Sequence, residues 1–543
     1  MTQKKFLFLL EIAIIVGLAI VPLFIHFPYR VNIFLSWEGA YRISQGQLPF
    51  RDFGVPMGGM YWVIPALFFK IFGPKLFSLV IAQVFINIIS GLAFRSILKS
   101  FSIPNGLRVS AVLLFCLSFS FFNFWPWYNH TVIVYELVAL AFLLRYITDR
   151  QSKYKWLLIS SSALFTFFCF FTKQDAGGMA VVICLVLLAY HSWIEKTWKP
   201  ILSYVGIFGF FMVAAILYFR QFEFGYWFNH GQPPHSARIS FVDIGSEFFG
   251  NSPWLRFYLF LVIFVVIVQY KEWQTFINDK QQLLFLLLTL GILGEAAIFQ
   301  VTSYTPPDNN IFFHSFAFVF IINGISNFAR IDFSKKSVII CVFAGVLFWW
   351  SGVYWKYFNR LFPQSFAKTQ AISTTGENVV NRNNYITASA IDSTVIPDSK
   401  WVLSGLPGFE KISLPEPTVS GMKRLLNLDV VKNGKALKVL NMSELTPLAV
   451  AIPYELDKGS HYPLWYHLGV GMFNREARMF EERIRNNYYD LVLFENIPGL
   501  NNFYPFRVRD TLINRYQMID SFYAPRRGGE TKGVIEVYIP KLK

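Results

Sequence analysis

Charged residues and cysteines are both scarce in this sequence. Lysine, arginine, aspartate and glutamate make up 15% of the 543 residues, whereas hydrophobic residues make up 54%. This composition lies far outside that of soluble domains, so the chain is predicted to be an α-helical polytopic membrane protein. The cysteines show no metal-ligand spacing, which argues against a disulfide framework or a zinc site, and we expect four small core residues: Cys116, Cys169, Cys184 and Cys341.

Two further absences limit the substrates and partners that the protein can have. The sequence has no glycine-rich phosphate loop of the P-loop or Rossmann type, so a soluble nucleotide donor is not expected. Acidic residues are too few to balance lysine and arginine, and the formal net charge is +16. Because the basic residues gather in short clusters between apolar runs, we interpret the charge as a topology signal, with membrane lipids as partners and no nucleic acid.

Long apolar runs fill the first two thirds of the chain. About eleven are long enough to cross a bilayer, near residues 6–25, 76–97, 107–125, 131–147, 156–172, 176–192, 200–219, 254–270, 282–300, 311–328 and 337–355. The first is expected to remain as an uncleaved span. The basic clusters between spans then share the cytoplasmic face of a multi-pass cell (inner) membrane protein. The N-terminus is predicted to be cytoplasmic and the C-terminus periplasmic or extracellular.

The composition changes near residue 356. Residues 1–355 form the predicted transmembrane domain, and residues 356–543, which are richer in polar residues, form a predicted soluble extracytoplasmic α/β domain. Short strand-like runs occupy residues 400–405, 448–453, 490–495 and 533–539, and amphipathic helical patterns occupy residues 474–488 and 506–516.

Polar residues that can carry chemistry concentrate in the first extracytoplasmic loop, residues 26–75. Glu38 and Asp52 are the candidate catalytic carboxylates, and Arg42 and Arg51 are candidates for anion binding. Each pairing has a structural alternative. Glu38 and Arg42 are four residues apart, so they can form an ordinary helix-surface ion pair worth a few tenths of a kcal/mol, and Asp52 with Arg51 can be a common loop pair.

Two short helices are predicted inside this loop. Residues 36–44 fit a helix with Ser36 as its N-cap and Gly46 beyond its end, on which Glu38 and Arg42 share one face. Residues 61–73 fit an interfacial helix that is too short to span a membrane.

The depth of the ionisable residues in the membrane distinguishes a transporter from an enzyme that acts on a lipid-linked substrate. Transporters normally carry such groups near the middle of the membrane, on broken helices. Here the spans are mostly free of charge, with the exceptions Glu11, Glu136 and Glu295. The last two lie in the outer halves of their spans and are expected to line a cavity wall rather than face lipid. Clustering at the outer surface favours a reaction on a lipid-linked substrate there.

Four segments carry a resemblance to a known family. They are the first apolar span, the loop SWEGAYRISQGQLPFRDFG, the segment PALFFKIFG before the second span, and FFTKQDAGG between the fifth and sixth spans. In order and spacing they resemble the GT-C superfamily of polyprenyl-phosphate-dependent glycosyltransferases, which includes protein O-mannosyltransferases and lipid A aminoarabinose transferases. The motifs cover roughly the first 200 residues, and the layout covers the rest.

The resemblance implies an inverting transfer of a sugar from a polyprenyl-phosphate-linked donor to a lipid, glycan or protein acceptor. The first-loop acid of the family, often an Asp-Glu pair, matches Glu38, whereas Trp37 stands in place of the second acid. Lys173 would lie near the lipid phosphate. The family often has an aspartate where the fourth span begins, and this chain has Asn129 and His130; no cofactor is therefore expected, and a divalent metal stays an open alternative.

The chemistry agrees with this resemblance. Displacing a phosphate at an anomeric carbon needs a carboxylate for the incoming hydroxyl and cations for the leaving phosphate. The predicted substrate and phosphate ligands are Arg42, Arg51, Lys173, His130, His235 and Arg238. Three of these assignments have a structural alternative. Lys173 can be a lysine at a helix end whose ammonium group extends to the membrane surface, and His130 can cap a helix. The aromatic residues of the loop 220–253, which contains His235 and Arg238, can form a belt at the membrane interface. The alternative functions are a transporter or flippase of a lipid-linked saccharide and a non-enzymatic envelope assembly factor.

Overall fold

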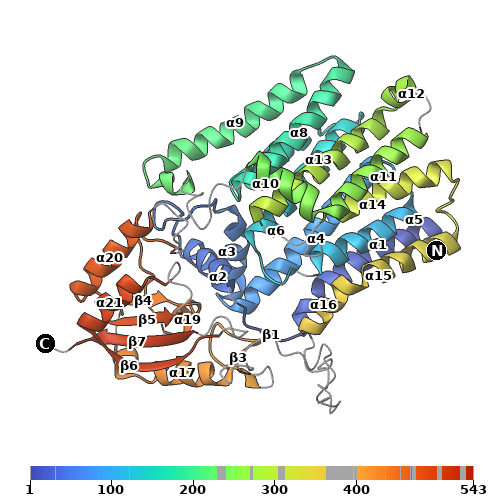
Figure 1. Cartoon of the computed structure of the whole chain (residues 1–543). Helices are drawn as coiled ribbons and strands as arrows, with labels where there is room; N and C mark the ends of the chain where they lie inside the picture. Colours follow the sequence, from blue (N-terminus) through green and yellow to red (C-terminus); the bar gives the residue numbers. More distant parts are fainter. Residues whose placement is uncertain are drawn as a thin grey trace, which may run out of the picture.

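The structure is a computed structural model. The structure describes residues 2–30, 32–121, 123–228, 240–269, 273–303, 312–361, 396, 400–434, 436–452, 454–464, 466, 472–497, 504–525 and 533–541. A bundle of helices forms the larger part of the molecule, and a smaller unit that contains a β-sheet packs against one end of it (Figure 1).

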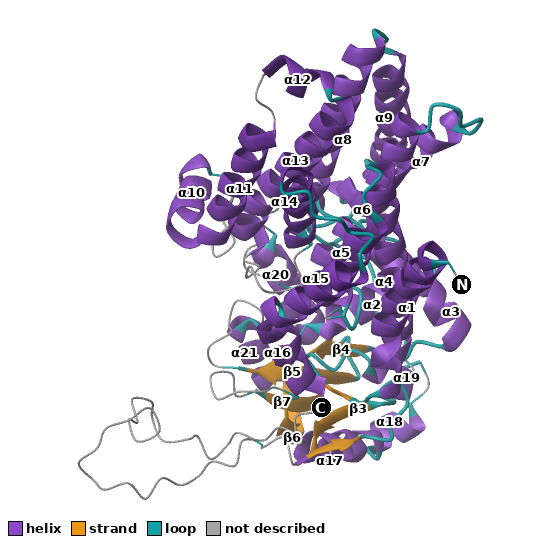
Figure 2. Cartoon of the chain, turned by 90° about the vertical axis from the view of Figure 1, so that its right-hand side faces the viewer, coloured by secondary structure: helices purple, strands orange, loops and turns teal. Residues whose placement is uncertain are grey.

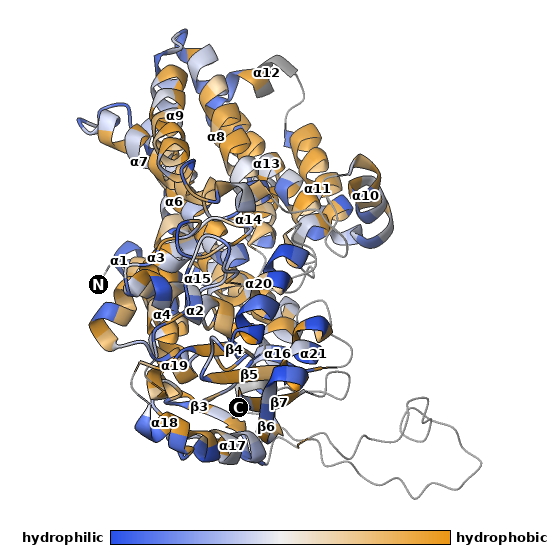
Figure 3. Ribbon diagram, turned by 90° about the vertical axis from the view of Figure 1, so that its left-hand side faces the viewer, coloured by the Kyte–Doolittle hydropathy of each residue, from blue (hydrophilic) through white to orange (hydrophobic). Residues whose placement is uncertain are grey.

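Each of the expected spans contains a helix: α1 (Gln3–Ile20), α4 (Leu76–Ser100), α5 (Asn105–Phe115), α6 (Tyr128–Thr148), α7 (Lys155–Phe170), α8 (Gln174–Glu195), α9 (Lys199–Phe219), α11 (Pro253–Gln269), α13 (Lys280–Ser303), α14 (Phe313–Phe328) and α15 (Lys336–Trp349). Among the described residues, six helices are long and apolar enough to cross a membrane, and two bent pairs raise this number to eight. The helical membrane character is confirmed, and the number of spans stays a prediction. Figure 3 shows the hydrophobic colouring of these helices.

The cysteines differ in their surroundings. Cys116, Cys169 and Cys184 are buried and free, as expected for small core residues. Cys341 is also free but exposed, so the expectation of a core position is wrong for this residue. It lies on the outer face of α15 beside Ile340, which is 67% exposed within the chain, and an apolar surface of this kind suits contact with lipid.

The first loop contains the two predicted helices, α2 (Ile33–Ser44) and α3 (Met60–Phe72). Gly46 follows α2 with a φ of +82°, which explains why glycine suits the end of this helix. The prediction that Ser36 caps α2 is wrong, because the helix begins three residues earlier, after Asn32 in a left-handed conformation (φ 73°). Ser36 is buried inside the helix and donates a hydrogen bond to the carbonyl of Pro126 (2.5 Å).

The C-terminal part is an α/β unit, as predicted. Its four-stranded sheet has the order β4-β5-β7-β6, with β4 (Val439–Met442) parallel to β5 (Leu491–Asn496) and antiparallel pairs elsewhere. Strand β5 is central, and its apolar side chains alternate between two clusters on opposite faces of the sheet. The remaining two strands are β7 (Val534–Pro540) and β6 (Tyr516–Tyr523).

Helices cover the sheet. The predicted amphipathic helices are confirmed as α20 (Phe473–Arg485) and α21 (Phe506–Arg515), and α17 (Glu416–Leu426) packs against β6. The predicted strand at 448–453 is wrong, because residues Leu448–Ala451 form the short helix α19. Pro447 precedes this segment in a helical conformation, and a short apolar run does not by itself distinguish a strand from a buried helical turn.

A second, three-stranded sheet joins the first loop to the C-terminal part. Strand β1 (Phe27–Pro28) follows the first membrane helix and pairs in parallel with β3 (Ile412–Pro415), which also pairs with β2 (Trp401–Leu403). Figure 2 shows the strands gathered at one end of the molecule, below the helices. The C-terminal part is therefore tied to the polar loop by backbone hydrogen bonds.

Candidate active site

Helix α2 brings Glu38 and Arg42 onto one buried face. Their spacing of four residues places the two side chains one turn apart. The Nε and Nη2 atoms of Arg42 lie 2.9 and 2.8 Å from Oε1 of Glu38. Glu38 is 6% exposed and Arg42 is 1% exposed, so the pair is a buried one and differs from the surface pair of the structural alternative.

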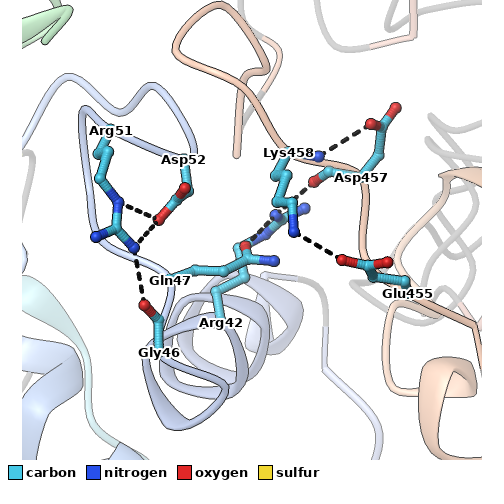
Figure 4. Close-up of polar contacts among 8 residues, drawn as sticks. All are labelled: Arg42, Gly46, Gln47, Arg51, Asp52, Glu455, Asp457 and Lys458. Carbon is cyan, nitrogen blue, oxygen red and sulfur yellow. Dashed lines mark hydrogen bonds and ion pairs between the residues drawn. The ribbon is translucent and has the colours of Figure 1, made fainter.

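The remaining contacts of Arg42 come from both ends of the chain. Its Nη1 donates to Oε1 of Gln47 (2.8 Å) and to the carbonyl oxygen of Asp457 (2.7 Å). Its guanidinium lies over the rings of Phe53 and Tyr462. Figure 4 shows Arg42 enclosed between Gln47 and Asp457. These contacts make Arg42 a fixed clamp on Glu38.

Glu38 keeps one oxygen available. Oε1 accepts both bonds from Arg42, whereas no side chain or backbone donor of the described residues bonds Oε2. Burial raises the pKa of Glu38 above its ordinary value of 4.5, and Arg42 offsets part of this rise. A carboxylate with one fixed and one unbonded oxygen, and with raised basicity, is suited to accept a proton.

Trp37 stands where the resemblance in sequence would place a second acid, and its surroundings are aromatic. It is fully buried, stacks on Tyr41 at 4.7 Å and donates a hydrogen bond to the carbonyl of Pro74 (3.0 Å). A carboxylate at this position would be buried among aromatic rings, which carries a large desolvation cost. Glu38 is therefore the acid that α2 presents to its polar partners.

Asp52 and Arg51 lie in the loop that follows α2. Oδ2 of Asp52 accepts hydrogen bonds from the backbone N–H of Leu48 (2.8 Å) and from Arg51 (2.6 and 2.8 Å), which also donates to the carbonyl of Gly46. Figure 4 shows the bonds from Arg51 to Asp52 and to Gly46, which close the loop. The Arg51 side chain is 37% exposed, so it is far more accessible than Arg42.

Lys173 occupies the turn before α8. Its Nζ lies 2.8 Å from Oδ2 of Asp175 and 4.9 Å from the ring centroid of Phe299 on α13. Two further carboxyl groups are buried in the bundle, Glu295 of α13 and Glu136 of α6, and their oxygens have no hydrogen-bond partner among the described residues. Both glutamates are fully buried, so they do not face lipid, and the expected cavity wall stays a prediction.

Backbone contacts join the first loop to the Lys173 turn. The N–H of Gly58 donates to the carbonyl of Thr172 (3.2 Å), and that of Met60 donates to Phe171 (3.3 Å). The loop that follows Glu38 and the turn that carries Lys173 therefore share one side of the helix bundle. A Cβ atom on Gly58 would lie 1.6 Å from the carbonyl oxygen of Phe171, so this approach requires glycine.

Replacing Gly58 with alanine is expected to destabilise the protein by about 1 to 3 kcal/mol, because the new methyl group would push the loop away from Phe171. Thermal unfolding of the purified protein, followed by tryptophan fluorescence, measures the loss. Gly178→Ala is the matched control, since a Cβ there meets no atom within 4 Å. Equal unfolding temperatures for the two variants would contradict the close contact.

The remaining predicted ligands fall in different places. His130 lies in the first turn of α6, where its ring contacts Phe119 edge-on at 6.1 Å. His235 and Arg238 lie outside the described residues. The part of the chain that the structure describes contains no cluster of three or more histidine, cysteine, aspartate or glutamate residues that could hold a metal ion.

The residues that sequence reasoning missed come from the segment 454–464. Tyr462 covers Arg42, Tyr454 lies within electrostatic range of Glu38, and Asp457 accepts from Arg42. Asp457 is itself held by Arg483 of α20 and by the hydroxyl of Tyr489 (3.2 Å). No local pattern in the sequence indicates these contacts, because they join residues about 415 positions apart.

The fold of this chain resembles that of a solved structure. No family model and no curated protein matches the chain. The crystal structure of ArnT from Cupriavidus metallidurans in the apo state matches with a TM-score of 0.50 and 10% identity, covering 98% of each chain. The same protein bound to undecaprenyl phosphate matches with a TM-score of 0.48 and 11% identity, with the same coverage. The present chain therefore has an ArnT-like fold over nearly its whole length.

Proposed function

We propose that this protein is an integral membrane glycosyltransferase. It would move a sugar from a polyprenyl-phosphate-linked donor to a lipid, polysaccharide or protein acceptor at the outer face of the membrane. The observation that carries the proposal is the buried Glu38, whose Oε1 is clamped by Arg42 and whose Oε2 receives no hydrogen bond from the described residues. The ArnT-like fold and the order of the sequence motifs support the same reaction.

The proposed step is a single displacement. Oε2 of Glu38 accepts the proton of the acceptor hydroxyl as the acceptor oxygen forms a bond to the anomeric carbon. The bond between that carbon and the phosphate oxygen breaks, and the electron pair leaves with the polyprenyl phosphate. Attack from the face opposite to the leaving group inverts the anomeric configuration.

The leaving phosphate gains negative charge, so a cation must lie near it. We assign this role to Arg51 and Lys173 in preference to Arg42, since the donors of Arg42 are directed at Glu38, Gln47 and Asp457. A phosphate beside Lys173 competes with Asp175 for the ammonium group. Asp52, whose Oδ2 accepts from Leu48 and Arg51, is better suited to bracing this loop than to proton transfer.

Residues 1–355 would supply the donor site, and residues 356–543 would form the extracytoplasmic unit. Tyr462 of that unit covers Arg42, whose guanidinium lies 5.0 Å from the centroid of the tyrosine ring. Tyrosine rings with polar edges are suited to packing against a sugar ring. We therefore place acceptor selection at this contact between the two units.

The test is transfer in reconstituted vesicles with a panel of polyprenyl-phosphate sugars. Undecaprenyl phosphate is the first carrier to try, because ArnT has been crystallised with it. Transfer of one sugar to an added acceptor, with release of the lipid phosphate, is the expected result. Purified protein that transfers none of the sugars, although the donors are intact, would overturn the enzyme proposal.

A second candidate function rests on a different observation. Glu136 and Glu295 are fully buried carboxyl groups within membrane helices, a feature that is common along transport pathways. A transporter or flippase would move the lipid-linked saccharide between leaflets without consuming it. Translocation of the donor in the same vesicles, without release of the lipid phosphate, would favour this alternative.

The raised pKa of Glu38 predicts the pH dependence of transfer. Since the base must be ionised, kcat/KM is expected to fall as the pH drops through the pKa of Glu38, and the midpoint should lie above 4.5. This midpoint is measured from initial rates across the pH range at constant ionic strength. Asp52→Asn should leave the midpoint in place. A midpoint at or below 4.5 would contradict a buried base.

A further inference from the structure

A basic cavity lies at the end of the bundle where the chain begins. It has a volume of about 560 Å³ and is formed by the start of α1, the end of α4 and the start of α5. Five basic side chains line it: Lys4, Lys5, Arg95, Lys99 and Arg108. The N-terminus lies at the end of α1 opposite to the C-terminal sheet, so this cavity is remote from the candidate active site (Figure 1).

The two arginines of the cavity are held in place by one buried acid. Oε2 and Oε1 of Glu11 lie 2.5 and 2.7 Å from the Nε atoms of Arg95 and Arg108, and Glu11 is fully buried. Arg108 also donates to Oδ1 of Asn105 (2.8 Å). Glu11 therefore fixes two guanidinium groups beside the cavity but neutralises only one of their two charges.

The three lysines leave the cavity strongly positive. Lys4, Lys5 and Lys99 are exposed, and none of them forms an ion pair with a described carboxylate. Two helices also begin here without a side-chain cap, at Gln3 for α1 and at Asn105 for α5. Their first N–H groups add partial positive charge to that of the side chains. The cavity thus has several separate donors for one anion.

The surface beside the cavity is apolar. Phe8, which lines the cavity and lies under the guanidinium of Arg95 at 4.8 Å, is 43% exposed. Phe6 and Leu9 on the same helix are 51% and 45% exposed. A free phosphate would use the charges and leave this surface bare, whereas a lipid would use both.

We propose that the cavity binds the headgroup of an anionic phospholipid, with an acyl chain against the exposed face of α1. The lipid phosphate would lie among the lysines and the two oriented arginines, and its chain would cover Phe6, Phe8 and Leu9. Basic pockets between membrane helices on the cytoplasmic side commonly hold such headgroups. The distribution of lysine and arginine along the chain predicts that this end is the cytoplasmic one. The site is separate from the proposed transfer reaction.

The test compares lipid binding by the delipidated full-length protein in vesicles of phosphatidylcholine alone and with phosphatidylglycerol added. The wild-type protein should bind phosphatidylglycerol in preference to phosphatidylcholine. The variant Lys4→Gln/Lys5→Gln/Lys99→Gln should bind phosphatidylglycerol at least tenfold more weakly than the wild type does. The control Lys153→Gln/Lys335→Gln/Lys336→Gln removes the same charge from exposed lysines outside the cavity and should bind like the wild type. The single variant Lys99→Gln replaces the triple variant if the latter does not fold.

Two outcomes would overturn the proposal. Equal losses in the cavity variant and the control would show a diffuse effect of surface charge. A second arm adds inorganic phosphate and follows the unfolding temperature of the wild-type protein. The overturning result of this arm has two parts: phosphate stabilises the wild type but not the cavity variant, and the wild type binds phosphatidylglycerol no better than phosphatidylcholine. In that case the ligand is a free phosphate and the lipid assignment fails.

Discussion

Replacing Glu38 with glutamine is expected to lower the rate of sugar transfer by about two to four orders of magnitude, the usual contribution of a positioned general base. Glutamine keeps the shape of the side chain and can still accept from Arg42 through its carbonyl oxygen, but it cannot take a proton. The effect should therefore appear in kcat, with a smaller change in KM. Initial rates with the active donor and acceptor measure it.

The control for this variant is Glu455→Gln. Glu455 lies on the segment that covers α2, but its side chain is 76% exposed and pairs only with Lys458. It should transfer sugar and unfold like the wild type, whereas Glu38→Gln should elute as a folded protein but unfold more easily, because it leaves the buried charge of Arg42 unpaired. Transfer by Glu38→Gln at the normal rate would remove Glu38 from the chemistry and leave it as a structural partner of Arg42.

The second large effect is expected from Arg42. Replacing it with methionine leaves a carboxylate, an amide and a backbone carbonyl without their donor, in a site where Arg42 is 1% exposed. The loss of one partner from a buried ion pair costs about 3 kcal/mol or more in unfolding free energy. Denaturant unfolding in detergent, followed by tryptophan fluorescence, measures this loss. The exposed Lys458→Met should show little change.

Two further measurements distinguish a stability loss caused by the broken ion pair from one caused by poorer packing of the methionine side chain. The double variant Glu38→Gln/Arg42→Met removes the unpaired charge, so it should regain much of the stability while remaining inactive. Without Arg42, burial raises the pKa of Glu38 without opposition, and the folded state binds more protons than the unfolded state. The stability loss of Arg42→Met should therefore shrink as the pH falls. A loss that is independent of pH and of Glu38 would contradict the buried pair.

Much of the fold follows from local patterns in the sequence. Apolar runs and their basic flanks locate the membrane helices, and the period of residues 474–488 locates α20 before any contact is known. The helix start at Ile33 could not be predicted in this way. It depends on Asn32, whose N–H is held by Oε2 of Glu444, a residue 412 positions away. A local capping rule applied to Ser36 cannot detect such a partner.

The candidate site was predictable only in part, for the same reason. The spacing of Glu38 and Arg42 indicates a shared helical face, and the structure contains that pair. Spacing does not reveal that Asp457 and Tyr462 enclose the pair, since burial at this point is set by a segment from the opposite end of the chain. Whether a pair is exposed and weak or buried and strong is therefore a tertiary property.

The pairing of β1 with β3 has a consequence for the order of events during synthesis. Ser413 donates to the carbonyl of Phe27, a residue 386 positions earlier. At 5 to 20 residues per second, roughly 20 to 80 s pass between the synthesis of these two strands. Throughout that interval Arg42 lacks Asp457, and Glu38 lacks its fixed clamp. A ribosome that stalls before the C-terminal unit therefore leaves an inserted but unassembled loop, and the enclosed pair of Glu38 and Arg42 forms only with the last part of the chain.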